Sequence, residues 1–276
     1  MTAWHLTFLG TAASAVSKAR NPTSMLLTID GRHLLVECAE GTTRRLVELG
    51  IDIRDIVAVY ISHGHNDHVS GIVTFLWQNV LVARRTKPLC IIGPGYVIET
   101  VKKMIDMMGT PAGFFSFELV YEPLDEQHLG EPCEIPGLAA GGHVTRRHAR
   151  SVHDPPARAI RIDIADPTGR VIVSLCYSSD TSPTGEVATL ATGCEYLVHE
   201  ATMSDEEEKA ATRFNHSTPS GAGRVATNAG AKHLVIVHYS VFLEGKESEI
   251  ITGAKKTFAG DVIVAKDLMG LPLQKR

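Results

Sequence analysis

Short apolar runs bounded by turn residues recur along the whole chain, and they predict strands that alternate with helices. Strands are predicted over 4–9, 24–30 and 33–38, and the Asp30-Gly31 pair between the last two is typical of a hairpin turn. Apolar residues at helical spacing predict a helix over 42–49 that ends at Gly50. The unbroken apolar run 56–61 predicts a strand that is buried on both faces.

The rest of the chain continues this alternation. It predicts helices over 69–83, 96–108 and 219–229, and strands over 89–92, 114–121, 159–164, 171–177, 196–199 and 234–237. Polar residues gather where several of these strands end, which is where open α/β folds usually place their chemistry. The pattern predicts an α/β fold, and the absence of a linker, repeat or low-complexity tract favours one domain over residues 1–276.

The composition narrows the classes of function. With 276 residues, of which 44% are hydrophobic, the chain can bury a large core. The net charge is −4, so binding to nucleic acid would need a local basic patch. No apolar run reaches the roughly 18 residues of a membrane span and no signal peptide is recognisable, so we expect no membrane contact. The five scattered cysteines, without a CxxC pair, indicate a reducing compartment and therefore the cytoplasm.

A dense group of metal-ligand side chains follows the run 56–61 directly. The segment reads Ser62-His63-Gly64-His65-Asn66-Asp67-His68. Imidazole together with carboxylate suits zinc, with manganese, iron or nickel as alternatives. Side chains at i and i+2 of an extended backbone point the same way, so His63 and His65 can bind one ion. Asp67 and His68 belong to the following turn and can reach a second ion.

Three more candidate ligands stand near the ends of predicted strands, namely His153, Asp180 and His238. Each alone is a weak signal, because an aspartate at a strand end is more often a turn residue or a helix cap. Their order along the chain and the segments around them make it more convincing that all three are metal ligands.

With these motifs the chain resembles the ribonuclease Z branch of the metallo-β-lactamase superfamily over nearly its whole length. The segment 62–68 resembles the metal signature of the superfamily. Other motifs resemble those of the branch: Glu37-Cys38-Ala39-Glu40-Gly41-Thr42 with Arg44, Tyr177-Ser178-Ser179-Asp180-Thr181, His199-Glu200-Ala201-Thr202, His216-Ser217-Thr218 and Val237-His238-Tyr239-Ser240.

The resemblance implies an αββα metallo-β-lactamase sandwich with two divalent metal ions in a cleft at the sheet edges. Zinc is expected, with manganese or iron as alternatives. Two ions roughly 3.5–4 Å apart lower the pKa of a shared water and stabilise an in-line displacement at phosphorus. The resemblance assigns one ion to His63, His65 and His153, the other to Asp67, His68 and His238, and a bridging position to Asp180.

The resemblance also implies which residues take part in catalysis, namely Asp67, His216 and Glu200. His216 would donate a proton to the leaving oxygen, and Glu200 would hold its ring in register. An alternative for Glu200 is an acid that stabilises a helix start. The N-terminal loop resembles a substrate-binding loop through Lys18, Arg20 and Asn21, although Val16 stands where the family usually has proline.

The chain departs from the family in one place. Ribonuclease Z enzymes commonly carry a long arm for tRNA between the equivalents of His153 and Asp180, but here only 27 positions separate the two, with one predicted hairpin between them. Around His153 lies a basic stretch that can form a phosphate-binding rim or an ordinary solvated loop. This stretch consists of Arg146, Arg147, Arg150, Arg158 and Arg161.

These observations predict a dinuclear metal-dependent hydrolase that cleaves phosphodiester bonds. The missing arm favours a small phosphodiester over an RNA 3′ end. The alternatives are a tRNA 3′-processing endoribonuclease and an arylsulfatase, lactonase or other ester hydrolase on the same fold. A redox protein and a binding module are disfavoured, because every expected ligand is present. A homodimer is expected.

Overall fold

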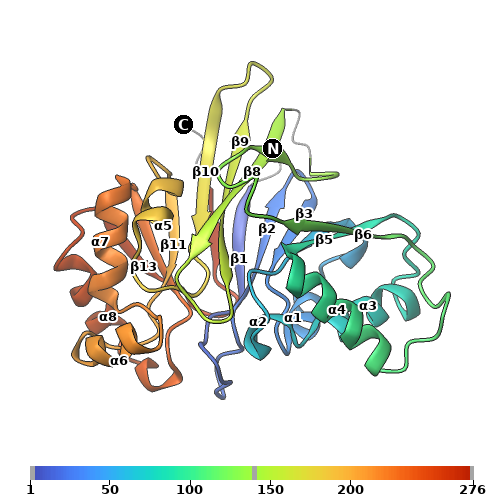
Figure 1. The fold of residues 1–276 in the computed structure, drawn as a ribbon, viewed down its shortest axis with the longest axis horizontal. Coiled ribbons are helices and arrows are strands. Elements are labelled where there is room, and N and C mark those ends of the chain that lie inside the picture. The colour runs from blue at the N-terminus through green and yellow to red at the C-terminus, as the bar shows by residue number, and fades with distance from the viewer. Residues whose placement is uncertain (1–3, 139–141, 274–276) are drawn as a thin grey trace.

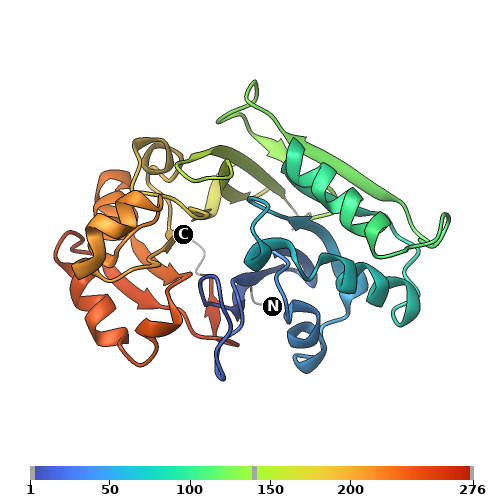
Figure 2. The ribbon, with the colours of Figure 1, turned by 60° about the horizontal axis from the view of Figure 1, so that its bottom comes forward.

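Two seven-stranded sheets lie face to face in the computed structural model, which describes residues 4–138 and 142–273. The strand orders are β14-β1-β2-β3-β4-β5-β6 and β13-β12-β11-β10-β9-β8-β7. Helices α1 to α4 cover the outer face of the first sheet and α5 to α8 that of the second (Figure 1, Figure 2). The predicted αββα sandwich is confirmed, since each sheet buries one face on the other sheet and one on helices.

The first half of the chain forms most of the first sheet. β1 to β3 pair antiparallel, whereas β3 to β6 pair parallel. The strands are β1 (His5–Gly10), β2 (Ser24–Ile29), β3 (Arg32–Val36), β4 (Ile56–Tyr60), β5 (Leu89–Pro94), β6 (Leu119–Leu124) and, from the C-terminal part, β14 (Gly270–Pro272). The helices are α1 (Thr42–Glu48), η1 (Ile53–Asp55), α2 (Asn66–Val69), α3 (Ile72–Leu81) and α4 (Gly95–Met107).

The second half forms the other sheet. β7 to β10 pair antiparallel, and β10 to β13 pair parallel. The strands are β7 (Cys133–Glu134), β8 (His143–Ser151), β9 (Ala157–Ala165), β10 (Val171–Tyr177), β11 (Tyr196–Glu200), β12 (His233–Val237) and β13 (Asp261–Val264). The helices are α5 (Gly185–Leu190), η2 (Asp205–Glu207), α6 (Glu208–Arg213), α7 (Pro219–Ala229), η3 (Val241–Leu243) and α8 (Glu247–Lys255).

The helix predicted over 69–83 is divided at Ser70 and Gly71 into α2 and α3. A Cβ atom at Gly71 would lie 2.0 Å from the carbonyl oxygen of Ala39, and the Gly71 N–H donates to the carbonyl oxygen of Cys38 at 2.9 Å. The loop after β3 therefore packs directly against the backbone of Gly71. This contact needs glycine and separates the ligand-bearing α2 from α3.

Two strands differ from the prediction. β6 begins at Leu119 and not at residue 114, because the Phe114 ring packs on Trp77 with 4.7 Å between ring centroids. β8 was not predicted, since Arg146 and His148 occupy inward-facing positions where apolar residues mark most strands. None of the helices in the described residues is long and apolar enough to span a membrane.

Candidate metal centre

The seven predicted ligands lie on α2 and on the loops that follow several strands, and these segments meet at one edge of the sandwich (Figure 1). The segment 62–68 follows β4, His153 lies between β8 and β9, Asp180 follows β10 and His238 follows β12. Within each of two groups, the potential ligand atoms lie within 4.8 Å of one another. The groups are His63, His65, His153 and Asp180, and Asp67, His68 and His238.

The ring nitrogens of these histidines face one another. Nδ1 of His65 lies 3.1 Å from Nε2 of His63 and 3.2 Å from Nε2 of His153. Nε2 of His68 lies 3.3 Å from Nε2 of His238. Neutral imidazoles that turn lone pairs toward a common point repel one another unless a proton or a cation lies between them. The arrangement of nitrogen donors therefore fits metal binding.

Asp180 stands between the two groups. Its Oδ2 lies 3.3 Å from Nε2 of His238, 3.4 Å from Nε2 of His68 and 3.8 Å from Nε2 of His63. Burial disfavours its charged form, but His238 and His68 hold the pKa of this carboxyl well below its usual range. Its Oδ1 is buried without a hydrogen-bond partner, which is costly unless a cation contacts it. The donor set thus fits two divalent ions that share Asp180.

In four of the five ligand histidines, the ring nitrogen that faces away from the centre has a polar neighbour. Such contacts fix the ring orientation and the tautomer of a metal ligand. The pairs are His63 Nδ1 with Ser62 Oγ at 3.0 Å, His68 Nδ1 with Glu37 Oε1 at 3.4 Å, His153 Nδ1 with the Asn215 carbonyl oxygen at 3.3 Å, and His238 Nδ1 with Thr202 Oγ1 at 3.0 Å.

Left-handed backbone conformations cluster around this centre. Five non-glycine residues beside or within the ligand loops have positive φ angles, namely Ser14 (59°), Glu37 (63°), Ser179 (56°), Asn215 (58°) and His238 (49°). Such conformations cost roughly 1–3 kcal/mol each and occur mostly where the surrounding structure enforces them. Here they turn the chain sharply at strand and helix ends, so that the ligands point into one cleft.

The partly buried His216 and the fully buried Glu200 form a pair at the rim of the centre. Nδ1 of His216 lies 2.8 Å from Oε1 of Glu200, while Oε2 of Glu200 accepts a hydrogen bond from the Thr202 hydroxyl at 2.7 Å. Burial disfavours the charged imidazolium, but the Glu200 carboxylate outweighs it and raises the pKa of His216 to about 9. A nitrogen of His216 also lies within 4.8 Å of ligand atoms of Asp180 and His238.

Only part of the predicted substrate loop is exposed to solvent. Lys18 is exposed, whereas Arg20 is only 5% exposed. The Arg20 guanidinium lies 3.5 Å from the centroid of the Tyr239 ring and donates to the Tyr239 carbonyl oxygen at 2.9 Å. The half-buried Asn21 donates its backbone N–H to Asp267 at 2.8 Å. Arg20 and Asn21 therefore hold the loop against the chain after β12, and substrate contact by Lys18 stays a prediction.

The basic stretch around His153 is not a free patch. The interpretation as a solvated loop is wrong, because these arginines lie on β8 and β9, and each pairs with a carboxylate. Because Glu126 and Asp163 each serve two arginines, three carboxylates neutralise the five charges only in part, which still weakens the predicted phosphate-binding rim. The pairs are Arg146–Glu122, Arg147–Asp163, Arg150–Glu126, Arg158–Glu126 and Arg161–Asp163.

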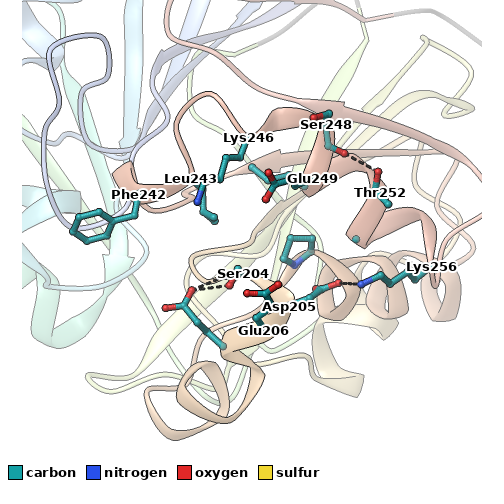
Figure 3. A pocket seen from close by; sticks show the side chains of 14 residues that line it. Ser204, Asp205, Glu206, Phe242, Leu243, Lys246, Ser248, Glu249, Thr252 and Lys256 are labelled. Atoms are coloured by element: carbon teal, nitrogen blue, oxygen red, sulfur yellow. Dashed lines mark hydrogen bonds and ion pairs between the residues drawn. The ribbon is translucent and has the colours of Figure 1, made fainter.

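A hollow of about 770 Å³ lies between η2, η3 and α8, outside the candidate metal centre. Figure 3 shows its polar lining, including the ion pair between Lys256 and Asp205, and Phe242 at its edge. Phe242 is 84% exposed. None of the seven predicted ligands lines this hollow, so it is a separate feature of the surface.

Comparison with known proteins identifies the family. The family model described as anti-Pycsar protein Apyc1 matches residues 4–218. Ribonuclease Z of Methanothermobacter thermautotrophicus is 31% identical, covering 96% of this chain and 95% of its own length. The chain belongs to the ribonuclease Z and Apyc1 family. Ribonuclease Z of Haloferax volcanii is 27% identical over 95% of the chain and 92% of its own length. As a member of this family, the protein is a metal-dependent hydrolase.

Solved structures show the same fold. The metallo-β-lactamase fold protein YhfI from Bacillus subtilis matches with a TM-score of 0.80 and 20% identity, covering 98% of this chain and 99% of its own. The short form of human tRNase Z (ELAC1) matches with a TM-score of 0.77 and 23% identity, over 98% and 99% of the two chains. Together with the relatives named ribonuclease Z, this shared fold confirms the predicted resemblance to the ribonuclease Z branch of the metallo-β-lactamase superfamily.

Proposed function

We propose that this protein hydrolyses phosphodiester bonds at a dinuclear centre. One divalent ion would be held by His63, His65 and His153, the other by Asp67, His68 and His238, and Asp180 would serve both. The position of Asp180 Oδ2 between the two groups, with Oδ1 buried and unpartnered, is the observation that carries the proposal. Zinc suits these nitrogen and oxygen donors, with manganese or iron as alternatives. Two bound ions would polarise a phosphate and lower the pKa of a water.

The protein's own side chains supply the proton for the leaving group. Because Nδ1 of His216 is held by Glu200, the other ring nitrogen is the one that can donate its proton. The Glu200 carboxylate raises the pKa of His216 and so favours its protonated form. In the proposed step the proton passes from Nε2 of His216 to the departing oxygen. Asp67, a proposed ligand of the second ion, is held in position by the backbone N–H of Ser14, which donates to its Oδ2 at 2.7 Å.

The substrate proposed here is a small phosphodiester. Two observations support it: β9 and β10 form a simple hairpin between His153 and Asp180, and the arginines of β8 and β9 are paired with carboxylates. The second candidate is cleavage at the 3′ side of a tRNA precursor, because several full-length relatives are named ribonuclease Z. We also propose a cytoplasmic location, which the five free cysteines suit, and a homodimer, which light scattering can test.

A panel of substrates tests this function on protein whose metal content has been measured. It contains bis-p-nitrophenyl phosphate, an aryl sulfate, a lactone and a tRNA precursor. Fast hydrolysis of the phosphodiester with slow cleavage of the precursor supports the proposal. Efficient 3′ cleavage of the precursor, with a steep salt dependence, would select the tRNA-processing alternative. Preference for the sulfate or the lactone would contradict phosphodiester specificity.

A further inference from the structure

Tyr96 connects two loops that reach the candidate centre from different sheets. We propose that Tyr96 is a positioning residue that sets the spacing between the loop of His63 and His65 and the loop of His153. The consequence is selective: Tyr96 tunes the binding of the ion at the three histidines and leaves the other ion unaffected. This inference rests on the dinuclear centre proposed above.

The Tyr96 hydroxyl makes one hydrogen bond to each loop. It accepts from the backbone N–H of Gly64 at 3.1 Å and donates to the carbonyl oxygen of Pro156 at 3.0 Å. A phenol hydroxyl has a single proton, so the carbonyl takes the donated bond and the amide supplies the accepted one. Gly64 lies between His63 and His65 in sequence, and Pro156 lies three positions after His153. One hydroxyl thus connects the backbones that carry all three rings.

The position of the Tyr96 ring is fixed by close packing of the neighbouring strand ends. A Cβ atom at Gly93, near the end of β5, would lie 2.6 Å from the carbonyl oxygen of Ile61, so β5 ends directly against the chain that leaves β4. Tyr96 follows in the first turn of α4. A Cβ atom at Gly64 would lie 3.2 Å from Cε2 of Tyr96, so the ring packs over a position that suits glycine.

Two other contacts join the same loops, but they lie nearer to the strands. The Tyr60 hydroxyl donates to the carbonyl oxygen of Arg158, and the Arg158 N–H donates to the carbonyl oxygen of Ser62 at 3.2 Å. These contacts fix where β4 ends and β9 begins. The Tyr96 bridge lies closer in sequence to His153 and beside the exposed His65, where the cleft opens.

The second group of ligands is held by different residues. Asp67 accepts from the Ser14 N–H at 2.7 Å, and His238 Nδ1 lies 3.0 Å from the Thr202 hydroxyl. Neither contact involves Tyr96 or Pro156. The backbone N–H of His68 does donate to the carbonyl oxygen of His65 at 3.1 Å, but the Tyr96 hydroxyl itself contacts only the loops of the first group, so its loss acts directly on that group alone.

The test is the Tyr96→Phe variant, which keeps the ring and removes the hydroxyl. Protein loaded with Zn²⁺ is titrated with a chromophoric chelator, and ion content is measured after dialysis. We expect one of the two ions to bind about tenfold more weakly, as is usual when a group that supports a metal ligand is lost, and the other to bind as in the wild type. Excess Zn²⁺ should then restore turnover of bis-p-nitrophenyl phosphate.

Two further variants make the result specific. Tyr121→Phe removes a hydroxyl from β6, at the edge of the same sheet, and should leave both ions unaffected. Gly64→Ala places a methyl group against the Tyr96 ring and should weaken the binding of the same ion as Tyr96→Phe.

The outcomes separate this proposal from the one it rests on. If the wild type binds two ions and Tyr96→Phe binds both with unchanged affinity, or loses affinity for both equally, the role of Tyr96 is overturned while the dinuclear centre stands. If the wild type takes up no ion, the centre itself is overturned, and the Tyr96 proposal with it.

Discussion

Nδ1 of His216 lies 2.8 Å from Oε1 of Glu200, with the carboxylate entirely inaccessible to solvent. A buried carboxylate is tolerated when its oxygens are satisfied, and here the backbone N–H groups of Thr181 and Thr202 complete the set. The pair therefore holds the imidazole ring of His216 at the rim of the cleft, where the Glu200 charge favours its protonated form. This geometry favours proton donation over the alternative interpretation of Glu200 as an acid at a helix start.

Replacement of His216 by alanine should spare metal content and fold but reduce turnover. Substrates with poor leaving groups should lose about 100-fold or more, whereas p-nitrophenolate, which needs little protonation, should lose much less. Kinetics with a series of phosphodiesters of rising leaving-group pKa measure the difference. Equal losses across the series would assign His216 a structural role.

Glu200→Gln should change the pH dependence of the same reaction. The Glu200 charge raises the pKa of His216, so its removal lowers that pKa, and His216 then loses its proton at a lower pH. We expect the alkaline limb of kcat for a poor leaving group to move to lower pH, with little change for p-nitrophenolate. An alkaline limb that stays in place would show that His216 does not control it.

The ligand assignment predicts different metal contents for different variants. His63→Ala or His153→Ala should leave one ion per chain, because each belongs to one group of ligands, whereas Asp180→Ala should weaken both sites. Mass spectrometry of dialysed protein gives the ion count. His128→Ala is the matched control, since His128 is exposed and pairs with Asp125. A single ion in the wild type would contradict the dinuclear assignment.

The arginine pairs predict effects on stability and not on small-substrate turnover. The buried Arg146 faces Glu122, so Arg146→Ala leaves a partly buried carboxylate unpaired and should lower the free energy of unfolding by about 3 kcal/mol. Arg150→Ala, at a half-exposed pair, should cost less than about 1 kcal/mol. Urea denaturation measures both. An unchanged stability for Arg146→Ala, together with weaker RNA binding, would restore the phosphate-binding rim.

The sequence predicts those parts of the fold and site that depend on local patterns. The apolar runs of β4 and β10 and the helix α7 are found close to their predicted bounds, and the Asp30-Gly31 turn has the two positive φ angles that such a hairpin needs. The group from His63 to His68 could be found for the same reason, because its ligands are neighbours in sequence.

Features that depend on distant contacts could not be predicted in this way. β8 was missed because its inward-facing Arg146 is neutralised by Glu122, which lies 24 positions earlier. The contacts of Thr202 with His238 and of Glu37 with His68 join residues that only the folded chain brings together. Tyr96 carries no recognisable motif, and its two partners lie 32 and 60 positions away.

The candidate ligands come from both layers of the sandwich: His63 and Asp67 follow a strand of one sheet, and Asp180 and His238 follow strands of the other. An ion bound by both sets would cross-link the two halves of the chain. Because unfolding separates these ligands, binding free energy would become folding free energy. The melting temperature of this enzyme would then report free metal concentration, and a cell short of the metal would lose folded protein as well as activity.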